Sequence, residues 1–125
     1  NAFIICIQIL LGTQVRENMD EVIRALGENA KAQWIENLDL GYITHRTFSW
    51  AILISHYFLW KNVQGTELNN TPYVRAFVFC IGISLISGVL MAYFALPMGS
   101  QPIHLTSSLV LLGLHVHAWL KTRSI

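Results

Sequence analysis

Charged residues are scarce in this 125-residue sequence: Asp, Glu, Lys and Arg together make up 12% of it, against 54% hydrophobic residues. Its mean hydropathy of +0.48 is too high for a soluble domain of this length. The run from Ala76 to Leu96 is free of charge over 21 residues, and about 20 helical residues cross the core of a bilayer. The sequence therefore predicts an integral membrane protein that contacts lipid.

Basic residues are few and scattered. Eight Lys and Arg face seven Asp and Glu, for a net charge of +1, and they lie singly between apolar segments. A nucleic-acid-binding protein instead gathers its basic residues on one face. The sequence therefore gives no indication of nucleic acid as a partner.

Cysteine is nearly absent as well. Cys6 and Cys80 both lie in apolar runs, with no Cys-x-x-Cys pair and no His-rich neighbourhood, so we predict neither a disulfide nor a zinc site. The first apolar run also lacks the basic region and small-residue cleavage site of a signal peptide. We expect the chain to be a fragment that begins inside a helix.

What the sequence does have is a series of apolar segments of membrane-spanning type. They predict four spans, the first of them truncated, at about residues 2–15, 40–60, 73–96 and 103–120. The connections between the later segments are short, as between antiparallel neighbours. We therefore expect an all-α fold in which residues 1–125 form one antiparallel four-helix bundle in the membrane.

Residues 17–39 have a different pattern, in which charged residues are mixed with apolar residues at helical spacing. This pattern predicts an amphipathic helix on the membrane surface, broken near Gly27. Asp39 then has the character of an N-cap for the following span.

The positions of Lys and Arg predict an orientation. Lys61, Arg75, Lys121 and Arg123 lie close to membrane ends on one side; the other side has Arg16, Arg24, Lys31 and Arg46. Three of the second group lie in or beside the long acidic segment and weigh less in the positive-inside rule. We therefore expect the 61–72 loop and the C-terminus on the cytoplasmic or matrix side.

Two histidines, His45 and His104, lie a few residues inside the predicted starts of the second and fourth spans. These two spans run in the same direction, so both imidazoles are expected at nearly equal depth. Ionisable residues inside a membrane are rare without a function. Two histidines on facing helices of a bundle are the arrangement that ligates one haem iron. The alternative is a pair of hydrogen-bonded packing residues.

Two arginines are candidates to bind the propionates of such a haem. Arg46 follows His45 directly, and Arg16 is at the same end of the first span. A guanidinium pairs well with carboxylates. The alternative for each is an interfacial arginine whose stem lies along apolar surface while its charge reaches water.

Several short motifs occur in an order that resembles a known family. They are Gln8–Glu17 (QILLGTQVRE), His45-Arg46, Ser87-Gly88, Tyr93–Pro97 (YFALP) and Gln101–Leu105 (QPIHL). The ordered set is similar to the carboxy-terminal half of haem A synthase, the membrane oxidoreductase of cytochrome oxidase assembly, and it covers nearly the whole chain.

The resemblance implies a protein of two four-helix halves, each with a histidine pair. The carboxy-terminal half would hold haem b through the iron ligands His45 and His104. The amino-terminal half is thought to oxidise a methyl group of haem O to the formyl group of haem A, which cytochrome c oxidase uses. Haem O would then be the substrate of the full-length protein, and haem O synthase or oxidase assembly proteins would be partners.

Two departures from the family matter. The amino-terminal half is absent from these residues, so no complete catalytic site is expected and catalytic residues stay unidentified. The segment 17–39 also lacks the cysteine pair that some members carry there.

Two other interpretations stay open. His56 and His115 each follow a histidine of the first pair by eleven residues, which places them about 16 Å along the same helix face; a dihaem electron carrier is therefore an alternative. A non-enzymatic membrane assembly subunit whose histidines only pack is another. We expect one haem, at His45 and His104, because the candidate propionate partners Arg46 and Arg16 lie near that pair alone.

Overall fold

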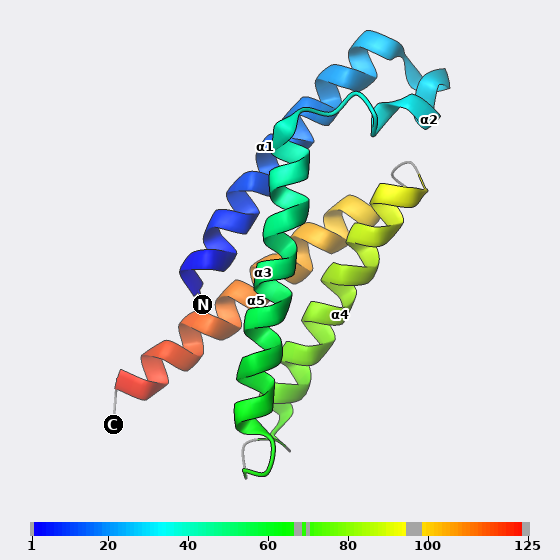
Figure 1. Ribbon diagram of the computed structural model, residues 1–125. Coiled ribbons are helices and arrows are strands. Elements are labelled where there is room, and N and C mark those ends of the chain that lie inside the picture. The colour runs from blue at the N-terminus through cyan, green and yellow to red at the C-terminus, as the bar shows by residue number, and fades with distance from the viewer. Residues whose placement is uncertain (1, 67–68, 70, 95–98, 124–125) are drawn as a thin grey trace.

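The computed structural model describes residues 2–66, 69, 71–94 and 99–123; 89% of these are helical and none is in a strand. The elements are α1 (Ala2–Leu26), the short 3-10 helix η1 (Glu28–Ala30), α2 (Lys31–Trp34), α3 (Leu40–Val63), α4 (Pro72–Tyr93) and α5 (Ser100–Arg123) (Figure 1). The predicted all-α class is confirmed.

α1 is one continuous helix, whereas the sequence predicted a truncated span over 2–15 and a separate surface helix over 17–39. The helix continues through the polar residues between these segments and ends at Leu26. The next residue, Gly27, has φ 80°, a conformation that only glycine adopts without strain. The break predicted near Gly27 is therefore present, but the predicted boundary between the first two segments is not.

The segment after α1 folds back against it. Trp34 of α2 is buried with Met19 and Val22 of α1, and its indole N–H donates to the Gly27 carbonyl over 3.2 Å. Some apolar residues of the predicted amphipathic segment are thus used to pack η1 and α2 onto the end of α1; the location of the segment on a membrane surface stays a prediction.

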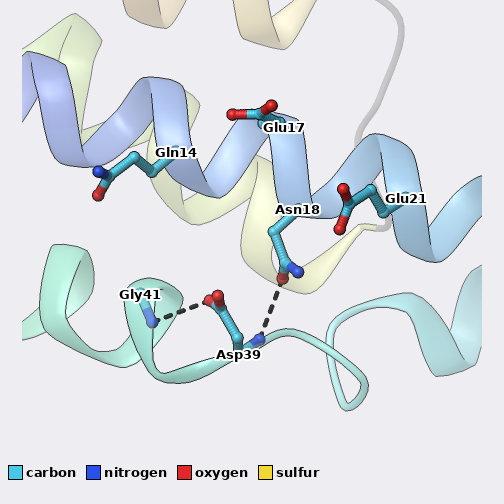
Figure 2. Close-up of a pocket in the computed structure, with 6 residues that line it drawn as sticks. All are labelled: Gln14, Glu17, Asn18, Glu21, Asp39 and Gly41. Carbon is cyan, nitrogen blue, oxygen red and sulfur yellow. Dashed lines mark hydrogen bonds between the residues drawn. The ribbon is translucent and has the colours of Figure 1, made fainter.

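The start of α3 is fixed by hydrogen bonds at its N-cap. The Asp39 carboxylate accepts from the Gly41 backbone N–H (2.9 Å), as predicted for a cap. The Asp39 N–H donates to Asn18 Oδ1 of α1 (3.0 Å), and Figure 2 shows both bonds. They lie in an open depression of about 410 Å³ lined by Gln14, Glu17, Asn18, Glu21, Asp39 and Gly41. The bond to Asn18 joins the start of α3 to α1.

The other helix boundaries lie close to the predicted ones. α3 continues to Val63, beyond the expected end at residue 60, and α4 begins at Pro72 behind the cap Thr71. α5 runs from Ser100 to Arg123 and exceeds the expected 103–120 at both ends. The predicted end of the third span at residue 96 lies outside the described residues.

The four long helices run in alternating directions along the chain (Figure 1). Close backbone contacts join α4 to α5, α1 to α3, and α1 to α5. α3 and α5 run in the same direction and are not among the helix pairs with close backbone contact; they meet through side chains, including two histidine ring pairs.

Large apolar side chains cover the outside of the protein. Phe3, Phe79 and Tyr93 are 76%, 68% and 70% exposed, while a small cluster around Ile5 and Leu111 is buried. Exposed apolar surface of this extent is unusual for a soluble monomer. Among the described helices, α4 and α5 are long and apolar enough to cross a membrane, which indicates membrane association.

Candidate functional site

His45 and His104, the first histidine pair, lie side by side. Each is about one turn inside its helix, α3 for His45 and α5 for His104. Their ring centroids are 6.4 Å apart and their planes are inclined by 70°. The common direction of α3 and α5 thus brings the two rings to the same height, as the sequence predicted.

His104 is held in one orientation by α4. Its Nδ1 lies 2.8 Å from the Ser84 carbonyl oxygen and 3.0 Å from Ser87 Oγ. Because a carbonyl only accepts, Nδ1 carries the ring proton, and the Ser87 hydroxyl donates its own proton to the Ile83 carbonyl (2.7 Å). Nε2 is therefore the lone-pair nitrogen of His104. Metal-bound histidines are typically oriented by such a bond from the other ring nitrogen.

His45 has a less complete set of partners. The Gln8 amide nitrogen donates to Ser49 Oγ (2.6 Å) and to the His45 carbonyl oxygen (3.1 Å), and it lies 3.4 Å from His45 Nε2. Gln8 Oε1 and His45 Nδ1 are buried without a hydrogen-bond partner. Since buried polar atoms nearly always have partners in folded proteins, these two atoms mark the surroundings of His45 as suited to a further group.

A glycine lies against each ring of the first pair. A Cβ added at Gly12 of α1 would lie 3.2 Å from His45 Cε1, and one at Gly88 of α4 would lie 3.3 Å from His104 Cε1. Both distances are tighter than ordinary van der Waals contact. The absence of side chains at these two positions therefore lets α1 and α4 approach the imidazole edges.

The two candidate arginines differ in their contacts. The exposed Arg46 follows His45, and its guanidinium lies 3.5 Å from the Tyr93 hydroxyl. Arg16 pairs with Asp20 one turn further along α1 (2.8 Å), and both side chains are nearly half exposed, at 49% and 42%. Arg16 is thus engaged by its own helix, whereas Arg46 contacts only a neutral hydroxyl in the described structure.

His56 and His115, the second histidine pair, also meet between α3 and α5. Their ring centroids are 5.0 Å apart with an interplanar angle of 78°. Phe77 of α4 packs beside them, with its ring centroid 4.6 Å from that of His115 and 6.4 Å from that of His56. His117, in contrast, is exposed and contacts the Tyr73 ring. The second pair is therefore closer together than the first and has an aromatic ring at its side.

In the part of the chain that the structure describes, no three His, Cys, Asp or Glu side chains gather around one point suited to a metal ion. Cys6 and Cys80 are both free thiols.

Comparison with protein-family models, with curated proteins and with solved structures finds no match for this chain. The assignment of function therefore depends on the geometry of the two histidine pairs and on the motifs of the sequence.

Proposed function

We propose that the chain is a haem b-binding membrane unit in which His45 and His104 are the axial ligands of one iron. The observation that carries the proposal is the spacing of the first pair. With metal–nitrogen bonds of about 2.0 Å and ring centroids about 1.1 Å behind the bonding nitrogens, two imidazoles on opposite sides of one metal have centroids about 6.3 Å apart. The rings of His45 and His104 are 6.4 Å apart.

The surroundings of the pair support a flat ligand. Gly12 and Gly88 place no side chain against the imidazole edges. The backbones of α3 and α5, which carry the ligands, do not pack closely, and a bundle whose facing helices stand apart suits a macrocycle between them. His104 already presents its Nε2 lone pair, because α4 holds its Nδ1 proton.

The second pair fits haem less well. Its centroid separation of 5.0 Å is shorter than the distance for two ligands on opposite sides of an iron, and Phe77 lies beside both rings. The dihaem alternative therefore has weaker support than a single haem at the first pair.

The proposed setting is an antiparallel four-helix unit that spans a bacterial plasma membrane or a mitochondrial inner membrane. α4 and α5 have the required length and hydropathy; α1 and α3 would cross beside them, with their polar residues facing the haem and the interfaces. The 61–72 loop and the C-terminus would lie on the cytoplasmic or matrix side, in accordance with the distribution of Lys and Arg.

The proposed activity follows from the family resemblance. A haem whose two axial positions are both filled by imidazole transfers electrons rather than binding oxygen. In a haem A synthase, the present unit would be the electron-transferring carboxy-terminal half, and haem O would bind and be oxidised to haem A in the other half. Haem O synthase and oxidase assembly proteins would then be partners.

Purification of residues 1–125 with haem b in a mild detergent tests the proposal. We expect one haem per chain, with the absorption and electron paramagnetic resonance spectra of a low-spin bis-histidine haem. A non-haem membrane assembly subunit would give no Soret band, and that result would reject the proposal.

Replacement of Arg46 with alanine is expected to weaken haem binding without abolishing it. A charge-assisted hydrogen bond to a propionate contributes about 1.5–3 kcal/mol, whereas the iron–imidazole bonds would remain. The measurement is the rate of haem transfer to apomyoglobin, together with the midpoint potential. Arg16→Ala is the matched control, because Arg16 is already paired with Asp20. Haem retention and a midpoint potential in Arg46→Ala that equal those of the unaltered chain would show that Arg46 does not contact the haem.

A further inference from the structure

The guanidinium of Arg46 and the hydroxyl of Tyr93 meet between α3 and α4. The two polar groups are 3.5 Å apart, and both side chains are exposed. The backbones of α3 and α4 are not among the helix pairs that pack closely, so this contact depends on the reach of two long side chains. Polar groups from two different helices thus come together at one point of the surface.

Both groups keep hydrogens that they can donate. A guanidinium only donates, so the Tyr93 oxygen is the acceptor of this contact and the phenol hydrogen is directed elsewhere. In the part of the chain that the structure describes, no acceptor takes that hydrogen and no carboxylate pairs with Arg46, whereas Arg16 has Asp20 as its partner. α3 and α4 contain no Asp or Glu. Two donors and one positive charge without an acceptor fit an anion that has two oxygens.

The position of these donors relates them to the first histidine pair. Arg46 directly follows His45. On α4, Tyr93 lies five residues beyond Gly88, the glycine at the edge of the His104 ring, which is a rise of about 7.5 Å along the helix. α4 ends at the same end of the protein at which α3 begins (Figure 1). The two donors are therefore close to the first pair, toward the nearer end of the bundle.

We propose that Arg46 and Tyr93 together bind one propionate carboxylate of the haem, with the guanidinium N–H and the phenol O–H donated to its two oxygens. The inference rests on the proposed haem site and adds Tyr93 to it as a residue that determines specificity. An O–H donor gains more from a charged carboxylate than from a neutral ester. The pair would therefore select a haem whose propionates are free.

Titration of the purified full chain with haem b and with its dimethyl ester, followed by the Soret band, tests this contact. Tyr93→Phe is expected to lower the affinity for haem b about five- to tenfold and to leave that for the ester unchanged. This loss is at the low end for a hydrogen bond to a charged group, because Tyr93 is 70% exposed. Tyr57→Phe is the matched control: it makes the same change on α3, eleven residues or about 16 Å beyond Arg46, and both affinities should stay the same.

The double variant Arg46→Ala/Tyr93→Phe shows whether the two side chains bind the same carboxylate. Groups that share one partner do not act additively. We therefore expect the double variant to lose less affinity for haem b than the product of the two separate losses. For the dimethyl ester, no such coupling is expected.

The possible results separate this contact from the haem site itself. An equal loss for haem b and ester in Tyr93→Phe would assign Tyr93 a structural role and overturn the proposal. Unchanged affinity for haem b in this variant would overturn it as well, also if the variant instead loses bound phosphatidylglycerol, since the anion would then be a lipid phosphate. In these cases the ligation by histidine stands. Absence of a Soret band with either compound would reject the proposed haem function, and the contact with it.

Discussion

Replacement of either His45 or His104 with alanine is expected to abolish the low-spin bis-histidine haem spectrum completely. The two rings come from different helices, α3 and α5, so each variant removes one of the two proposed ligands. Alanine provides no ligand for the iron. The remaining histidine alone would leave one axial position to a weaker ligand, so the spectrum would change to high spin or the haem would be lost. The measurement is the absorption spectrum of the ferric and ferrous protein, with haem content from the pyridine haemochrome.

Variants at the other histidines are the controls for this result. His117→Ala removes an exposed imidazole near the end of α5, and His56→Ala removes a buried one at the second pair. Both are expected to keep one haem per chain. A His45→Ala or His104→Ala protein that retains the low-spin spectrum would contradict the proposed ligation, and loss of one of two haems in His56→Ala would support the dihaem alternative.

The sequence predicted those features of the fold that local chemistry determines. Asp39 and Pro72 mark the starts of α3 and α4 because a capping carboxylate and a proline are favourable there independently of the rest of the chain. The meeting of His45 with His104 followed from helix direction alone. The continuity of α1 was not predicted, because the pattern changes from apolar to charged at Arg16 and Glu17. Both residue types favour helix, so the change in polarity does not end the helix.

The contacts around the histidines were beyond sequence reasoning. α4 is apolar on nearly all sides, so periodicity does not show which face turns toward α5. For that reason the hydrogen bond between His104 Nδ1 and the Ser84 carbonyl appeared only in the structure. The contact of Gln8 of α1 with His45 of α3 was not predicted either. The ion pair of Arg16 with Asp20, one turn away, was also not predicted; a contact of Arg16 with a propionate stays a prediction.

The different spacings of the two histidine pairs could not be predicted either. Both pairs have the same separation in sequence, so an ideal helix makes them equivalent. The structure distinguishes them, with centroid distances of 6.4 Å and 5.0 Å. Phe77 lies beside the second pair, whereas Gly12 and Gly88 lie beside the first. The neighbours contributed by α1 and α4 thus differ between the two pairs.

Replacement of Gly88 with valine is the second change expected to have a large effect on haem binding. Even a methyl group at Gly88 would lie 3.3 Å from His104 Cε1, and the two γ carbons of valine need more room still. The His104 ring cannot turn freely to make that room, because its Nδ1 proton is bonded to the Ser84 carbonyl. Metal–ligand distances tolerate shifts of only about 0.2 Å. We therefore expect haem affinity to fall at least tenfold, measured by haem transfer to apomyoglobin.

Gly82, on the same helix, is the matched control. A Cβ there has no atom within 4 Å outside its own helix, so Gly82→Val introduces the same side chain into α4 without touching a histidine. Both variants also carry the same change in helix propensity, which cancels in the comparison. Haem affinity that falls in Gly88→Val and not in Gly82→Val would therefore be due to displacement of His104. Equal affinities in the two variants would mean that the ring of His104 is free to move away from α4, and the hydrogen bond from its Nδ1 to Ser84 would then not be what orients the proposed iron ligand.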